Sequence, residues 1–83
     1  MASALEQYVE RKNEIREAFG FETIQWPLTQ QGVREVHNYL DADCSPENLT
    51  CDGEASREQV RDRKDFYTRV QQELSLIGAA HVG

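Results

Sequence analysis

With 83 residues, the chain is long enough for one small domain, residues 1–83. A core of this size cannot spare the apolar contacts that a large buried active-site cavity would remove. The length therefore weighs against an enzyme. Its 39% hydrophobic and 29% charged residues lie near the norms of globular proteins, which argues against a disordered chain. The net charge of −6 disfavours phosphate backbones and anionic membranes as partners and favours a protein with a basic surface.

The first predicted element is a helix over residues 4–19. Ser3 and Glu6 have the spacing of a capping box, in which each side chain pairs with a backbone amide at the start of a helix. Apolar residues then recur at helical spacing as far as Phe19, and Gly20 is a favoured stop. We therefore expect an amphipathic helix with one face on the core.

Residues 21–26 alternate apolar and polar side chains before Pro27, a pattern that predicts a short extended segment. Because a lone strand has no pairing partner, we expect Phe21, Ile24 and Trp26 to pack across the helices. Trp26 should be mostly buried; the rival interpretation is an exposed anchor for a partner. An α+β fold is the alternative if this segment pairs with part of residues 41–55.

Two further helices are predicted, over residues 29–41 and 57–77. Thr29 has the position of an N-cap, and Ser56 with Gln59 forms another capping box. Between them, residues 41–55 are rich in turn formers and predict a long loop. Gly78 should end the last helix and leave a frayed tail over residues 79–83. The elements predict an all-α domain of three helices.

The apolar positions that share a helix face predict the core. It should contain Leu5, Val9, Ile15, Phe19, Val33, Val36, Leu40, Val60, Tyr67, Val70 and Leu74.

The first helix carries a row of like charges at helical spacing: Glu6, Glu10, Glu14 and Glu17. Like charges at i,i+4 destabilise a helix slightly, so the presence of four glutamates in a row needs an explanation. A solvated face is one interpretation. The other is a contact strip for a basic partner protein, and we take these four residues as the candidate partner-binding site.

The last helix suggests the alternative site, a nucleic-acid surface made of Arg57, Arg61 and Lys64. Residues 1–55 hold eleven acids against four bases, whereas residues 56–83 hold five bases against four acids. Arg61 opens an i,i+4 series of alternating sign with Asp65, Arg69 and Glu73, which predicts a self-paired ladder. The ladder leaves few cations for phosphates, so nucleic acid is the less favoured partner.

Arg63 falls within the apolar stripe of the last helix, where an unpaired guanidinium would be costly to bury. We expect it to pair with an acid of the preceding loop (Asp41, Asp43 or Glu47), or to lie at the rim of a partner interface.

Cys44 and Cys51 are interpreted as free thiols, with a disulfide as the alternative. A zinc site with His37 and His81 or Asp43 is disfavoured because no Cys-x-x-Cys pair is present. We find no cofactor motif, no phosphate-binding glycine loop and no nucleophile with an adjacent base.

The sequence therefore predicts a non-enzymatic protein-interaction module, an accessory or regulatory factor that binds a basic partner through the acidic first helix or the acidic 41–54 loop. No apolar run is long enough to cross a bilayer, and the first residues lack a secretory pattern. We expect a cytoplasmic location without membrane partners.

Overall fold

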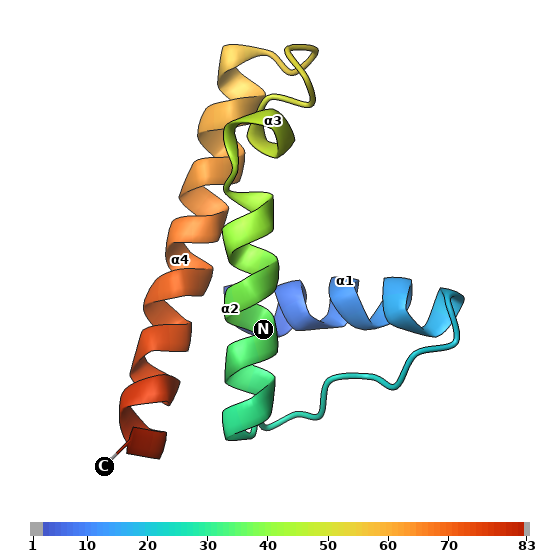
Figure 1. Ribbon diagram of the computed structural model, residues 1–83. Coiled ribbons are helices and arrows are strands. Elements are labelled where there is room, and N and C mark those ends of the chain that lie inside the picture. Colours follow the sequence, from blue (N-terminus) through green and yellow to red (C-terminus); the bar gives the residue numbers. More distant parts are fainter. Residues whose placement is uncertain (1–2, 83) are drawn as a thin grey trace.

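The computed structural model describes residues 3–82, and the side chains of residues 3–78. Over this range the fold is all-α, as predicted, with four helices and no strand: α1 (Ala4–Ala18), α2 (Gln30–Asp43), α3 (Pro46–Leu49) and α4 (Arg57–Val82). Figure 1 shows α2 and α4 lying antiparallel, α1 running across them, and the short α3 near one end of the pair.

The three predicted helix starts are confirmed by capping hydrogen bonds. The Ser56 hydroxyl accepts from the Gln59 N–H at 3.1 Å, and the Gln59 side-chain oxygen accepts from the Ser56 N–H at 2.9 Å. The Thr29 hydroxyl accepts from the Gly32 N–H at 3.1 Å, and Ser3 caps α1 in the same way. Local sequence is sufficient for these caps because they involve residues three apart.

The predicted end of the first helix is also confirmed. Gly20 has a φ of 77°, in the left-handed region, and its N–H donates to the Glu17 carbonyl. The Phe21 N–H donates to the Arg16 carbonyl at 2.8 Å, which completes a Schellman motif.

The predicted end of the last helix is wrong. α4 continues through Gly78 to Val82, so residues 79–82 are helical and not a frayed tail, while Gly83 lies outside the described residues. A Cβ built on Gly78 would lie 3.9 Å from Val33 Cγ1 of α2, so this glycine sits where two helices approach each other. Two alanines follow it, and alanine has the highest helix propensity.

The predicted 41–55 loop is shorter than expected. α2 extends to Asp43, and Pro46–Leu49 forms one helical turn with Pro46 at its start, where a missing N–H costs nothing. Leu49 is buried and secures this turn to the rest of the molecule.

One apolar cluster joins α1, α2, α4 and the segment after α1. Its buried members are Leu5, Tyr8, Val9, Ile24, Leu28, Val36, Leu40, Val70 and Leu74. Six of these were predicted as core positions on the helices. Val33 and Tyr67 are partly buried against the cluster, and Val60 is partly buried.

Two predicted core residues are exposed, because only the first half of α1 buries apolar side chains. Leu5, Tyr8 and Val9 are its buried residues, and the Tyr8 ring meets Phe66 of α4 edge-on. The second half of α1 projects beyond the α2–α4 pair (Figure 1). The predictions that Ile15 and Phe19 lie in the core are therefore wrong.

Candidate interaction surface

Residues 13–27 form a projection that we call the arm. It comprises the second half of α1, the Gly20 turn and the segment that returns toward the start of α2, as Figure 1 shows. The returning segment has neither helix nor strand, and Ile24 is buried while Thr23 and Gln25 are exposed. Glu22 and Trp26 are exposed as well, so Ile24 alone is buried and residues 21–26 do not alternate in exposure as the sequence pattern suggested.

Side chains of α1 hold the returning segment by its backbone. The Ile24 N–H donates to Asn13 Oδ1 at 2.7 Å, and Asn13 Nδ2 donates to the Ile24 carbonyl at 3.0 Å. Arg16 Nε donates to the Glu22 carbonyl at 2.6 Å. The side-chain amide of Asn13 thus pairs with Ile24 as a neighbouring strand would, which the sequence pattern did not reveal.

Arg16 also ties the arm to α2. Its Nη1 donates to the Tyr39 hydroxyl at 2.9 Å, and its Nη2 lies 3.9 Å from a Glu35 carboxylate oxygen. The guanidinium therefore joins three parts of the chain with one rigid group, which fixes the base of the arm. A hollow of about 800 Å³ lies beside it, between the returning segment and the start of α2.

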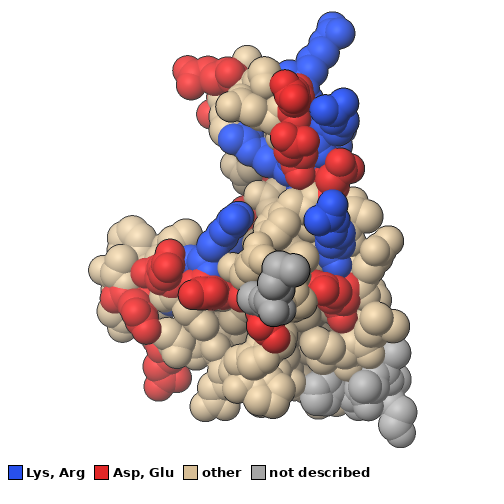
Figure 2. Space-filling view, turned by 180° about the vertical axis from the view of Figure 1, so that it is seen from behind, with Lys and Arg blue, Asp and Glu red and all other residues tan. Residues whose placement is uncertain are grey.

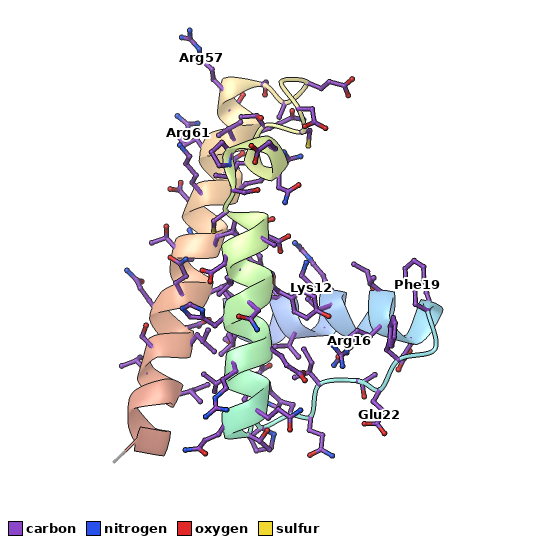
Figure 3. All side chains as sticks on the ribbon, viewed as in Figure 1. Lys12, Arg16, Phe19, Glu22, Arg57 and Arg61 are labelled. Atoms are coloured by element: carbon purple, nitrogen blue, oxygen red, sulfur yellow. The ribbon has the colours of Figure 1, made fainter. Side chains whose placement is uncertain are left out.

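The arm exposes four large apolar side chains. The exposed fractions are 53% for Ile15, 74% for Phe19, 65% for Phe21 and 44% for Trp26. The predictions that Phe21 and Trp26 pack across the helices are wrong, since only Ile24 of that segment reaches the core. Figure 3 shows Phe19 at the far end of α1, away from the α2–α4 pair.

The predicted partner-binding glutamates lie along the arm and its base. Glu6, Glu10, Glu14 and Glu17 are all exposed, and no ion pair involving them occurs in the described part of the chain. Glu10 and Glu17 stand three residues before and four after Asn13, so they are its neighbours on the helix surface. The acidic row therefore flanks the returning segment, and Figure 2 shows carboxylates gathered on this projection.

The second predicted docking place, the acidic 41–54 loop, is less available. Asp43 accepts a hydrogen bond from the Tyr8 hydroxyl and lies 2.8 Å from Lys12 Nζ. Asp41 lies 3.4 Å from His37 Nδ1. Two acidic residues of the 41–54 loop, Asp41 and Asp43, therefore already contact other side chains of the protein.

Tyr8, Lys12 and Asp43 form a partly buried polar joint between α1 and the end of α2. Burial, followed by the hydrogen bond to Asp43 and the charge of that carboxylate, holds the pKa of Tyr8 far above its usual value near 10. The Lys12 ammonium also lies 5.1 Å from the centre of the Tyr8 ring. The only sequence signal for this joint was the i,i+4 spacing of Tyr8 and Lys12; Asp43 was considered as a partner of Arg63 and as a zinc ligand, but no pattern connected it with Tyr8.

The alternative nucleic-acid residues come together at the other end of the molecule. Arg57, Arg61 and Lys64 line one hollow of about 510 Å³ whose wall includes Val60, and Arg57 and Arg61 lie far from the arm in Figure 3. Arg61 lies 4.0 Å from Glu58, so this cation is partly neutralised.

The predicted ladder along the last helix does not form within residues 57–78. Arg61 pairs with Glu58 instead of Asp65, and Glu73 has a different role. Its carboxylate accepts a hydrogen bond from the Leu5 N–H at 2.6 Å, where it stabilises the positive start of α1.

Arg63 is satisfied without an acid, so the predicted pairing with Asp41, Asp43 or Glu47 is wrong. Its Nη1 donates to the Leu49 carbonyl at 2.9 Å and lies 3.0 Å from Cys51 Sγ. A backbone carbonyl at the end of α3 was closer than any carboxylate of the loop.

Cys44 and Cys51 are free thiols. Burial, with the charges of Asp43 and Asp41, raises the pKa of Cys44 and keeps its thiol protonated. Among the described side chains, no three histidine, cysteine or acidic residues lie close enough together to hold a metal ion.

Across residues 3–82, no helix is both long and apolar enough to span a bilayer. Comparisons with protein families, with curated proteins and with solved structures found no match for this chain. On the described surface, the arm is where exposed apolar side chains and unpaired carboxylates lie together.

Proposed function

We propose that this chain is a non-enzymatic protein-interaction module, an accessory or regulatory factor of the cytoplasm, whose arm binds a basic partner protein. The observation that carries the proposal is the set of four exposed apolar side chains on the arm: Ile15, Phe19, Phe21 and Trp26. Exposed aromatic residues grouped on a projection are typical of binding hot spots, and contact with a partner removes them from water.

Charge complementarity supports a basic partner. The acidic row flanks the same projection, and Glu22 adds an exposed carboxylate to it. Carboxylates around an apolar centre speed the encounter with a cationic partner and form ion pairs at the rim of the interface. The two free thiols are in keeping with a reducing compartment.

The experiment is a selection of peptides from a random displayed library on the immobilised full chain. We expect enriched peptides to combine lysine or arginine with apolar residues. Their binding should weaken with added salt, because screening reduces attraction between exposed charges. A variant with Phe19→Ser, Phe21→Ser and Trp26→Ser should lose at least tenfold in affinity for these peptides.

The matched control is Leu76→Ser. Leu76 is 74% exposed, the same fraction as Phe19, but it lies on α4 outside the arm. This variant should bind the selected peptides as the wild type does. Three outcomes would each overturn the proposal. They are enrichment of acidic peptides, enrichment of peptides that bind the arm variant as well as the wild type, and no enrichment at all.

Nucleic-acid binding is the second candidate, because the structure places Arg57, Arg61 and Lys64 around one hollow. It ranks lower because Glu58 lies beside Arg61 and the molecule as a whole is acidic. Titration of a labelled single-stranded and a labelled double-stranded oligonucleotide tests it. Binding that falls steeply with salt and is lost in the Arg57→Gln, Lys64→Gln variant would favour this candidate over the arm.

A further inference from the structure

The returning segment of the arm has one occupied backbone edge. Toward α1, the Ile24 N–H and carbonyl pair with Asn13, and the Glu22 carbonyl accepts from Arg16. These groups belong to alternate residues, as expected when an extended chain turns every second residue toward the same neighbour. Three backbone groups on one edge of the segment are therefore engaged by side chains of α1.

The opposite edge is open. By the same alternation, we expect the N–H and carbonyl groups of Thr23 and Gln25 to point away from α1. Both residues are exposed, and their backbone groups make no hydrogen bond within the described part of the chain. Figure 1 shows α1 on one side of this segment and no other element along its outer side.

We infer that this open edge binds an extended segment of the partner protein, which pairs by its main chain with Thr23 and Gln25. The inference rests on the proposed function and states how the partner is held. An unpaired strand edge is a ready template for another chain, and peptide recognition by strand addition uses main-chain hydrogen bonds for affinity.

The side chains around the open edge indicate which side chains the bound partner segment should carry. Phe21 and Trp26 flank the open residues and are both exposed, so they offer apolar contact to the partner. Glu17 and Glu22 lie near the start of the segment and are exposed as well. A segment in which basic and apolar residues alternate matches both features, because an extended chain presents alternate side chains to opposite faces.

The experiment uses three synthetic peptides on the wild-type chain. The first is a blocked peptide of alternating lysine and valine. The second carries N-methyl groups on every second residue, which blocks one of its backbone edges and prevents a helix. The third is N-methylated at every residue, which blocks both edges. We expect the first two to bind within about threefold of each other and the third to bind at least tenfold more weakly, because it cannot donate to the open edge.

A second measurement reads the protein itself. Amide hydrogen exchange should slow at Thr23 and Gln25 when the first peptide is added, while Ile24, whose N–H already pairs with Asn13, should change little. A variant with Phe21→Ser and Trp26→Ser should weaken binding of the first two peptides.

The outcomes separate the inference from the proposed function. Strand addition is wrong if the second peptide does not bind while an amphipathic basic helical peptide binds through the arm. It is also wrong if all three peptides bind the arm with equal affinity. In both cases the proposed interaction module is retained. If no peptide depends on Phe21 and Trp26, both are wrong. The chain without peptide provides a last outcome. If sedimentation shows a dimer and the amides of Thr23 and Gln25 are already protected from hydrogen exchange, the edge pairs with a second copy of the chain and the inferred partner is overturned.

Discussion

Asn13 and Tyr8 are two of the side chains that hold the arm and the joint, and both act through hydrogen bonds to residues distant in the sequence. Asn13 satisfies the backbone of Ile24 with both ends of its amide. Tyr8 donates its hydroxyl proton to Asp43, thirty-five residues further along the chain. Loss of Asn13 would leave the Ile24 N–H and carbonyl without their partner, whereas loss of the Tyr8 hydroxyl would leave Asp43 with Lys12 alone.

Replacement of Asn13 tests the first of these contacts. Asn13→Ala removes both hydrogen bonds to Ile24 and should lower the free energy of unfolding by about 1–3 kcal/mol. The Ile24 amide should exchange with solvent at least tenfold faster, as measured by nuclear magnetic resonance. Asn38→Ala, on an exposed position of α2, is the control and should change neither quantity. Unchanged exchange at Ile24 in Asn13→Ala would contradict the geometry of the arm.

Tyr8 predicts a pH dependence of stability. The pKa of Tyr8 is higher in the folded state than in the unfolded state, where it lies near 10. The contribution to stability is therefore complete below about pH 10 and is lost as the pH rises above it, because only the unfolded chain releases the proton there. Tyr8→Phe should reduce stability at pH 7 and flatten its decline above pH 10, as measured by urea unfolding at a series of pH values.

A parallel decline in wild type and Tyr8→Phe would show that another group carries the effect. Tyr67 is the natural comparison, because burial followed by the charge of Asp43 also raises the pKa of Tyr67. Tyr67→Phe should therefore remove a separate share of the alkaline decline.

At the scale of elements, local patterns located the helix starts and faces but not what each face contacts. Periodicity placed Ile15 and Phe19 on the apolar side of α1, and they do continue that side. Whether an apolar residue is buried depends on how far the neighbouring helices extend, and Leu5, Tyr8 and Val9 are the buried residues of α1. The pairing of Asn13 with Ile24 gave no signal in the sequence, since it depends on a return of the chain that no local motif encodes.

The two glycines predicted as helix stops provide a test at this scale. Gly20 has a left-handed φ and no neighbouring atom that a Cβ would meet, whereas Gly78 lies inside α4 with room for a methyl group. Gly20→Ala should cost about 1 kcal/mol because L residues are strained there. Gly78→Ala should stabilise the protein by about 0.5–1 kcal/mol through helix propensity. Thermal unfolding of both variants decides this, and destabilisation by Gly78→Ala would restore a helix end at that position.

At the scale of the whole molecule, the arm concentrates charge of one sign. Glu10→Gln with Glu14→Gln removes two repulsive i,i+4 pairs, Glu6–Glu10 and Glu10–Glu14, so the free energy of unfolding should stay equal or rise by about 0.2–0.5 kcal/mol for each pair. The same variant should associate more slowly with the peptides selected on the wild type and show a flatter salt dependence. Asp52→Asn with Glu54→Gln changes the net charge equally outside the arm and serves as the control. Identical association rates in both variants would exclude the acidic row from the contact.

The exposed aromatic groups of the arm also bear on how the protein behaves among its own copies. Two arms could bury their apolar side chains against each other, but each copy brings the same glutamates and a net charge of −6 to such an encounter. At low ionic strength this repulsion extends over tens of ångströms, and at about 1 M salt it extends over only about 3 Å. The solubility of the protein should therefore fall as salt is added, and the carboxylates that attract a basic partner also keep the unbound molecules dispersed.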